Sequence, residues 1–171
     1  MTDHAAQLQQ ETPEVQHLVK SLGLAPHVEG GYFRRTYTAA TTTTTPAGER
    51  PINSSIYYLL TEQQPIGFWH RNRSDILHFF HCGDVLTYWL LDPSGKLQHV
   101  TLGADLAAGE QPQLLVPGGY WKATALGNGS YGLVSESVTP GFDYSDMELA
   151  DEGLLEQHPE HRAAIEPLLK P

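Results

Sequence analysis

Residues 67–83 read Gly-Phe-Trp-His-Arg-Asn-Arg-Ser-Asp-Ile-Leu-His-Phe-Phe-His-Cys-Gly, and the rest of the chain can be interpreted outward from them. This stretch carries His70, His78 and His81 on two short apolar runs that end at a glycine. About thirty residues later, residues 114–122 read Leu-Leu-Val-Pro-Gly-Gly-Tyr-Trp-Lys. Short apolar runs punctuated by Gly and Pro are typical of strands joined by turns. We therefore expect β-structure in both stretches, with the histidines carried on strands.

Similar short runs, rich in apolar, aromatic and β-branched residues, follow one another from residue 32 onwards. The nine runs are residues 32–37, 54–60, 68–70, 76–81, 85–91, 97–102, 113–116, 120–126 and 131–138. Asp92-Pro-Ser-Gly95 and Gly127-Asn-Gly129 lie between neighbouring runs and are typical of tight turns, so we expect a β-hairpin at each. Short strands spaced about 8–12 residues apart predict an all-β sandwich or barrel. No helical pattern alternates with them, which disfavours a parallel sheet.

Both ends of the chain carry helix signals. Thr12, Pro13 and Glu14 match an N-cap, a first-turn proline and a first-turn acid, and Gly23 matches a C-cap glycine. Apolar residues recur with helical spacing between these caps, at Val15, Leu18, Val19 and Leu22. We expect a helix at residues 13–22 that covers one face of a sheet. Residues 152–157 and 159–169 also look helical, and we expect this tail to pack outside the barrel.

Two polar stretches are expected to be irregular. Residues 1–11 are polar and aperiodic, and residues 41–45 are a run of threonines followed by Pro46-Ala-Gly48, which predicts a mobile loop. No internal repeat or linker divides the chain. We therefore expect a single domain over residues 1–171, with the barrel at about 28–150.

Composition limits the classes of partner. The 171 residues carry a formal net charge of −10, which argues against nucleic acid or an anionic membrane surface as a partner. The sequence begins without a signal-peptide pattern and has no apolar run of about 18 residues, so we expect a cytoplasmic protein. The single Cys82 excludes an intrachain disulfide, and a lone cysteine is more often a small core residue than a reactive thiol.

The two stretches at 67–83 and 114–122 resemble the two motifs of the cupin superfamily, written G(X)5HXH(X)3-4E(X)6G and G(X)5PXG(X)2H(X)3N. His70 matches the first histidine, Gly83 the closing glycine, and residues 117–119 the PXG of the second motif. This chain differs at three metal-ligand positions: Asn72 replaces a histidine, Ile76 the glutamate and Lys122 the last histidine.

A wider succession of motifs resembles a branch of small single-domain cupins of unknown function. It comprises Glu29-Gly-Gly-Tyr-Phe-Arg34, Ser55-Ile-Tyr-Tyr-Leu-Leu60, His70-Arg-Asn-Arg-Ser74, Gly83, Val116-Pro-Gly-Gly119 and Val138-Thr-Pro-Gly-Phe142. The resemblance covers roughly residues 28–165. It implies a double-stranded β-helix, which is a jelly-roll barrel, with a small-molecule pocket inside and commonly a homodimer. It implies no particular reaction, because fold alone does not determine function.

Strand geometry separates the histidines. Side chains alternate across a strand, so Ile76, His78 and Phe80 share one face while His81 lies on the other. The resemblance places the position of Ile76 inside the barrel, and we therefore expect His78 to face inwards and His81 outwards. It also points His70 into the barrel, where a neutral imidazole could act as a base or be a hydrogen-bonded part of the wall.

Lys122 and Glu136 are the charged residues expected at this pocket. The ammonium of Lys122, on the same strand face as Tyr120, could bind a carboxylate or phosphate, or act as an acid if burial lowers its pKa. Glu136 lies on an apolar strand face and needs a partner there, because an unpaired buried carboxylate is costly. Each of these side chains is also compatible with a structural role. The expected site comprises His70 and Lys122 as catalytic residues and His78, Tyr120 and Glu136 as ligand-binding residues.

A metal site is not expected. Metal binding needs three or four convergent donors, and the inward face offers two histidines beside a lysine cation that would repel a divalent ion. We expect no cofactor.

Three functions remain open on the sequence. The first is a metal-independent isomerase or epimerase acting next to a carbonyl, as in cupins of the dTDP-4-dehydrorhamnose 3,5-epimerase kind. The second is a non-catalytic binding module for a small anionic metabolite. The third is a degenerate metal-dependent cupin, either a dioxygenase or a lyase.

Overall fold

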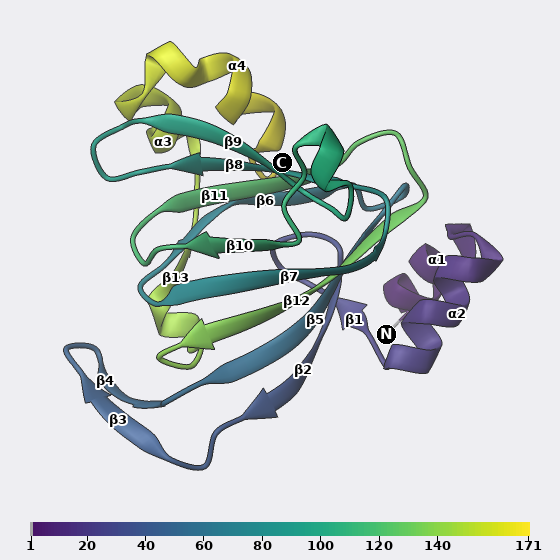
Figure 1. Ribbon diagram of the computed structural model, residues 1–171, viewed down its shortest axis with the longest axis horizontal. Coiled ribbons are helices and arrows are strands. Elements are labelled where there is room, and N and C mark those ends of the chain that lie inside the picture. The colour runs from purple at the N-terminus through teal and green to yellow at the C-terminus, as the bar shows by residue number, and fades with distance from the viewer. Residues whose placement is uncertain (1) are drawn as a thin grey trace.

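Two antiparallel sheets face each other and form the body of the molecule (Figure 1). The computed structural model describes residues 2–171, with side chains from residue 5 onwards. The first sheet contains, in spatial order, β1 (Ala25–Pro26), β2 (Tyr32–Thr38), β5 (Ser54–Thr61), β12 (Tyr131–Thr139), β7 (Asp75–Gly83) and β10 (Gln113–Val116). The second contains β13 (Met147–Leu149), β6 (Ile66–Asn72), β11 (Trp121–Leu126), β8 (Leu86–Leu91) and β9 (Leu97–Leu102).

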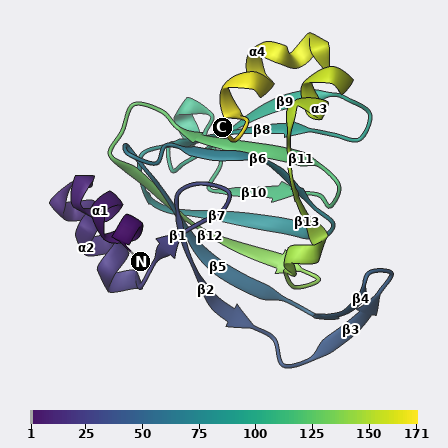
Figure 2. The same cartoon turned by 180° about the vertical axis from the view of Figure 1, so that it is seen from behind.

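Helices cover the outside of the two sheets. The chain begins with α1 (Thr2–Gln10) and α2 (Pro13–Leu22), which lie together beside the first sheet (Figures 1 and 2). The tail contains α3 (Glu152–Gln157) and α4 (Arg162–Ile165), which lie over the second sheet. Short 3-10 turns complete the helical structure, at η1 (Leu106–Ala108), η2 (Tyr144–Asp146), η3 (Pro159–His161) and η4 (Glu166–Leu168).

All nine predicted strands are present, with ends within two residues of the expected ones, and so is the helix at residues 13–22. The Thr12 hydroxyl accepts a hydrogen bond from the Val15 N–H, and Gly23 ends this helix with φ +63° in the left-handed region. The predicted helical tail is also present, from residue 152 to 168. The expected all-β jelly roll with helices packed outside is therefore confirmed.

Two of the expected irregular regions are regular. Residues 2–10 form α1, in keeping with the good helix propensity of their Ala, Gln and Leu residues. The threonine run forms β3 (Thr42–Thr45), which pairs with β4 (Gly48–Pro51) in a hairpin that projects from the body (Figure 1). Threonine is β-branched and favours strands, and this preference prevails over the polar composition.

One predicted hairpin is wrong. The turn at residues 127–129 leads from β11 in the second sheet to β12 in the first, so it crosses between the sheets. The turn at residues 92–95 does join paired strands, β8 and β9. Cys82 is exposed, and the expectation that it belongs to the core is also wrong.

Alternation along the strands sorts the apolar side chains into three clusters. The cluster between the sheets contains the buried Leu60, Leu86, Tyr88 and Val134. The cluster under the C-terminal helices contains Trp69, Leu91, Ile165 and Leu168. The cluster under the N-terminal helices contains Val15, Val19, Tyr32 and Leu59. One strand, β6, therefore packs Trp69 outwards against the tail and His70 inwards into the barrel.

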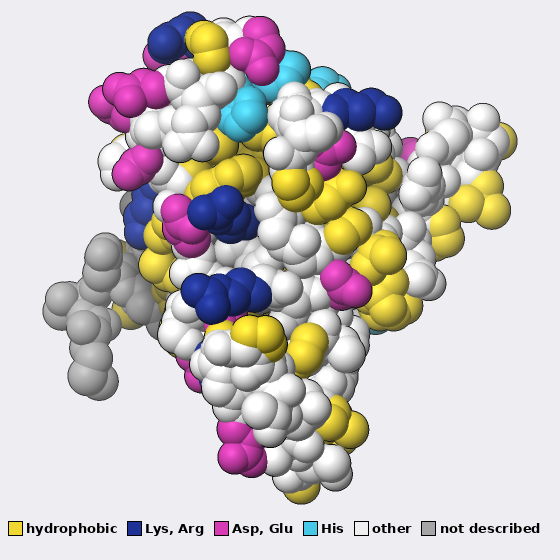
Figure 3. Space-filling view, turned by 90° about the vertical axis from the view of Figure 1, so that its left-hand side faces the viewer, with side chains coloured by type: hydrophobic (Ala, Val, Ile, Leu, Met, Phe, Trp, Pro, Cys, Tyr) yellow, Lys and Arg dark blue, Asp and Glu magenta, His cyan; other side chains and the backbone are white. Residues whose placement is uncertain are grey.

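Basic side chains do not gather on the face shown in Figure 3, which is the side of the molecule with the β3–β4 hairpin. Lys and Arg lie there among acidic, polar and apolar side chains. Within residues 2–171, no helix is both long and apolar enough to cross a membrane.

Candidate functional site

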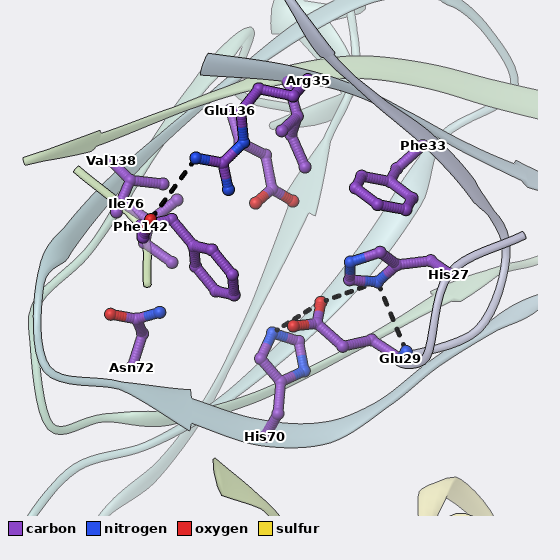
Figure 4. Close-up of a pocket in the computed structure, with 11 residues that line it drawn as sticks. His27, Glu29, Phe33, Arg35, His70, Asn72, Ile76, Glu136, Val138 and Phe142 are labelled. Atoms are coloured by element: carbon purple, nitrogen blue, oxygen red, sulfur yellow. Dashed lines mark hydrogen bonds and ion pairs between the residues drawn. The ribbon is translucent and has the colours of Figure 1, made fainter. Parts of the chain in front are cut away.

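A pocket opens between the two sheets at one end of the barrel (Figure 4). It contains about 400 Å³ of space between atoms, part of it open to solvent. Its polar lining comes from both sheets and from the turn that precedes β2. The lining residues are His27, Glu29, Phe33, Arg35, Ile56, His70, Asn72, Ile76, Glu136, Val138 and Phe142.

The turn at residues 27–31 presents two of these side chains, His27 and Glu29. The His27 N–H donates to the carbonyl of Gly31 (2.9 Å), and the Gly30 N–H donates to the carbonyl of His27 (3.1 Å). The carbonyl of Glu29 accepts from the Phe68 N–H at 2.7 Å, which ties the turn to β6. Gly30 has φ +94°, and a Cβ there would collide with the backbone of β6, so the turn can approach this closely only with glycine.

Glu29 and His70 form a buried pair in the pocket. Oε2 of Glu29 lies 3.2 Å from Nε2 of His70, and both side chains are almost fully buried. Nδ1 of His70 lies 2.7 Å from the carbonyl oxygen of Phe68, so this nitrogen carries a proton and donates it to the carbonyl. In the neutral ring, Nε2 then has a lone pair that can accept a hydrogen bond from a protonated Glu29.

The pKa values of this pair agree with that assignment. Burial raises the pKa of Glu29 to about 8, and burial together with the charge of Lys122 lowers the pKa of His70 to about 3. At neutral pH the pair therefore holds one ionisable proton between Oε2 and Nε2. His27 is close to the same carboxyl, with Nδ1 3.4 Å from Oε2, and burial lowers its pKa to about 4.

A second buried cluster joins the two sheets. Lys122 on β11 extends its Nζ to 2.7 Å from Nε2 of His78 on β7 and to 3.4 Å from Oε2 of Glu136 on β12. Burial, and then the charge of Lys122, lowers the pKa of His78, so its neutral ring accepts a hydrogen bond from the ammonium. Burial alone would raise the pKa of Glu136, but the ammonium of Lys122 outweighs it and holds that pKa well below the usual range.

The two carboxyl groups that line the pocket are therefore in opposite states. Glu29 is protonated at neutral pH because burial raises its pKa, and Glu136 is ionised because the ammonium of Lys122 outweighs the effect of burial. Carboxyl groups whose environments push their pKa values apart are typical of acid–base sites.

The outer part of the pocket has a basic and an aromatic side chain. The guanidinium of the exposed Arg35 lies over the ring of Phe142, 5.4 Å from its centroid, and donates a 3.4 Å hydrogen bond to the carbonyl of that residue. Apolar side chains from the first sheet, among them Ile56, Ile76 and Val138, form the rest of this wall.

The structure brings together four of the five residues expected at the site. His70 and Glu136 line the pocket, while His78 and Lys122 lie one step deeper, in contact with Glu136. Tyr120 packs against the apolar core and is not among the lining side chains. The expected directions of His78 and His81 are correct, since the first is fully buried and the second exposed.

Sequence reasoning assigned no role to His27, Glu29 or Arg35. The signal that could have found Glu29 is its position immediately before Gly30-Gly31. Two glycines allow a turn to lie close against a strand, so that the side chain of the preceding residue can enter the barrel.

The donor set does not fit the metal centre that the cupin motifs describe. Asn72 and Ile76 occupy two of the metal-ligand positions and line the pocket. Lys122 occupies a third, and its ammonium lies beside the carboxylate of Glu136. Among the described residues that line the pocket, Glu136 has the only carboxyl group that is ionised at neutral pH. Among the described side chains, no group of three or more His, Cys, Asp or Glu residues is placed to hold a metal ion.

Comparisons with known proteins agree with this architecture. The family model described as "Cupin superfamily (DUF985)" matches residues 16–150. The "Uncharacterized protein YML079W" of Saccharomyces cerevisiae is 36% identical over 152 residues, which is 77% of this chain and 73% of the yeast protein.

Two solved structures are also similar. Protein SO0799 from Shewanella oneidensis is 39% identical, with a TM-score of 0.84, over 91% of this chain and 97% of that one. A hypothetical protein from Leishmania major is 32% identical, with a TM-score of 0.85, over 94% of this chain and 100% of that one. The family model covers well over half of the chain, and the fold, the motifs and the relatives point the same way: the chain belongs to the cupin superfamily.

Proposed function

We propose that the pocket binds a small carbonyl compound and moves a proton on the carbon next to the carbonyl, as a metal-independent isomerase or epimerase does. The observation that carries this proposal is the buried pair of Glu29 and His70, 3.2 Å apart, in the lining of the pocket. A carboxyl with a pKa of about 8 can both lose and regain a proton near neutral pH, which is what general acid–base catalysis requires.

Glu136 is the weaker candidate for the proton-transfer group. The ammonium of Lys122 holds its pKa well below the usual range, so its carboxylate has little tendency to take a proton from carbon. Lys122, which sequence reasoning made a catalytic residue, is held by His78 and Glu136 and is not in the pocket lining. We assign it to positioning and charge balance.

The step itself is a simple enolisation. The Glu29–His70 pair, after losing its shared proton, takes a proton from the carbon beside the carbonyl, and the C–H electron pair moves to form the enolate. In an isomerase, the pair then returns the proton to the former carbonyl carbon, while the proton of the neighbouring hydroxyl moves to the former carbonyl oxygen. In an epimerase, a water molecule donates the proton to the other face of the same carbon. No oxidant or metal is required for this balance.

The test is solvent exchange in D2O. A panel of 2-oxo acids, aldoses and ketoses is incubated with the protein, and loss of the C–H signal next to the carbonyl is followed by proton NMR. We expect exchange of at least one compound, abolished by Glu29→Gln and by His70→Ala. His81→Ala removes an exposed histidine outside the pocket and is the matched control. Absence of exchange across the panel, or full exchange in Glu29→Gln, contradicts the proposal, and saturable binding without exchange favours the binding module.

The expected homodimer and the expected cytoplasmic location stay predictions. A dimer is supported by the family resemblance and by large apolar side chains left exposed, among them Tyr37, Ile52 and Tyr144. Light scattering at micromolar concentration should give twice the mass of one chain, and a monomeric mass would contradict it.

A further inference from the structure

Asn72 has a buried hydrogen-bond donor with no partner among the described residues. Its side chain is part of the pocket lining, only 5% of the residue is exposed, and its Nδ2 is fully buried without an acceptor. Figure 4 shows the amide pointing into the pocket, with its nitrogen towards Phe142 and its oxygen away. A buried donor without an acceptor is unfavourable, and native structures keep few of them.

The orientation of this amide is determined by its surroundings. Oδ1 accepts a hydrogen bond from the Ser74 N–H at 2.9 Å, a role that the NH2 group could not fill. The backbone of Asn72 pairs with Met147 on β13, and its carbonyl accepts from the Gly119 N–H at 2.8 Å. The donor is therefore held in place before any ligand arrives, which favours tight and selective binding.

Asn72 and His70 lie two residues apart on β6 and both face the pocket. Residues at this spacing on one strand face are separated by about 7 Å. An acceptor atom bound by Nδ2 of Asn72 would thus place the carbons beside it near the Glu29–His70 pair.

At the outer end of the same pocket, Arg35 offers a positive charge. Its guanidinium contacts the carbonyl and the ring of Phe142, both neutral groups, in the interactions described above. A guanidinium binds a carboxylate through paired, charge-assisted hydrogen bonds.

We infer that Nδ2 of Asn72 donates a hydrogen bond to the carbonyl oxygen of the ligand while Arg35 binds a carboxylate, which makes the ligand class a small 2-oxo acid. The inference rests on the proposed function, because it concerns the same pocket and names the carbonyl compound. A 2-oxo acid has its carboxylate on one side of the carbonyl and an enolisable carbon on the other, so the two groups and the proton-transfer pair can be engaged together.

Pyruvate and propionate are suitable probes, because both carry a carboxylate on a three-carbon chain and only pyruvate has the carbonyl oxygen. Binding of each is measured by NMR titration of the full chain. We expect pyruvate to bind wild-type protein about tenfold more tightly than propionate, as one well-placed hydrogen bond would give. Arg35→Gln should weaken the binding of both compounds by about tenfold and leave the ratio of their affinities unchanged.

Two variants test Asn72 directly. Asn72→Ser keeps an oxygen able to accept the Ser74 N–H in an equivalent turn but has no group that reaches the pocket, and Asn72→Asp replaces the donor by an acceptor. In both variants, pyruvate and propionate should bind with nearly equal affinity, so the ratio of the two affinities should be close to one. Asn53→Asp is the matched control, because Nδ2 of Asn53 already donates to Ser137, Val138 and Thr139 and does not line the pocket.

The outcomes separate this inference from the proposed function. A tenfold ratio that persists in both folded Asn72 variants, or no saturable binding of pyruvate to wild-type protein, overturns the inference. Asn72-dependent pyruvate binding without deuterium exchange supports the inference and removes the proposed function. Exchange of another carbonyl compound, with no effect of Asn72→Ser, leaves the proposed function and removes the inference. If Asn72→Asp fails to fold, Asn72→Ser decides.

Discussion

Replacing Glu29 by glutamine should make the protein more stable, and increasingly so as the pH rises. Glu29 is almost completely buried, and burial raises its pKa from an ordinary value of 4.5 to about 8. Between these two pH values the folded protein binds a proton that the unfolded chain has lost. The free energy of unfolding therefore falls as the pH rises through this window.

The size of the effect follows from the two pKa values. Each pH unit inside the window corresponds to about 1.4 kcal/mol, so Glu29 should lower the free energy of unfolding by about 3 kcal/mol at pH 7 and by about 5 kcal/mol above pH 8, relative to its value below pH 4.5. Glutamine has no such dependence, and its NH2 group can still donate to Nε2 of His70 in place of the protonated carboxyl.

The assay is urea unfolding of wild-type protein and Glu29→Gln at several pH values from 5 to 9. The difference between the two should grow with pH and level off above about pH 8. Other titrating groups contribute to both proteins alike, so they cancel in this difference. Glu62→Gln changes an exposed glutamate and serves as the matched control. Parallel curves for wild-type protein and Glu29→Gln would show that Glu29 is ionised at neutral pH and would refute the assignment of the shared proton.

The other predictions use the same kinds of measurement. Lys122→Met leaves the buried charge of Glu136 without its partner and should lower the free energy of unfolding by about 3–5 kcal/mol, whereas adding Glu136→Gln should recover most of this loss. Gly30→Ala should lower the free energy of unfolding by more than about 2 kcal/mol, because residue 30 has positive φ and the new Cβ would collide with the carbonyl oxygen of Ile66. Gly109 also has positive φ but has open space around it, so Gly109→Ala should lower the free energy of unfolding by only about 1 kcal/mol. In the proposed reaction, the exchange rate should rise with pH and level off above about pH 8, as the buried carboxyl ionises, and a rate that falls over this range would contradict the role of that group as the base.

The strands could be predicted because their signal is local. In the run at residues 131–138, the buried positions 134, 136 and 138 alternate with the half-buried positions 135 and 137, so its inward face can be read from the sequence. The same alternation placed Glu136 and His78 inside the barrel, and strand pairing then makes them direct neighbours. The turn at residues 127–129 shows the limit of local information. Its residues specify a tight turn but do not determine whether the next strand joins the same sheet or the opposite one.

The pairing of Glu29 with His70 could not be predicted from local sequence patterns, for a different reason. Glu29 and His70 are 41 residues apart in the sequence, and they meet only because the turn at residues 27–31 docks on β6 through the hydrogen bond from Phe68. Lys122 was expected to meet the ligand, but its long side chain crosses to the opposite sheet and is held there by Glu136. The reach of a flexible side chain depends on the distance between the sheets, which no pattern in one strand encodes.

The pairing of β13 with β6 has a consequence for the tendency of the chain to self-associate. Residues 147–149 cover the outer side of the strand that carries His70 and Asn72, and β13 is the last strand in that sheet. Without it, β6 would present a row of free N–H and C=O groups to the solvent, and such open edges attract strands from other molecules. By pairing with β6, residues 147–149 thus prevent aggregation at the edge of the strand that carries His70 and Asn72. A chain shortened before residue 147 should therefore self-associate as well as lose its tail.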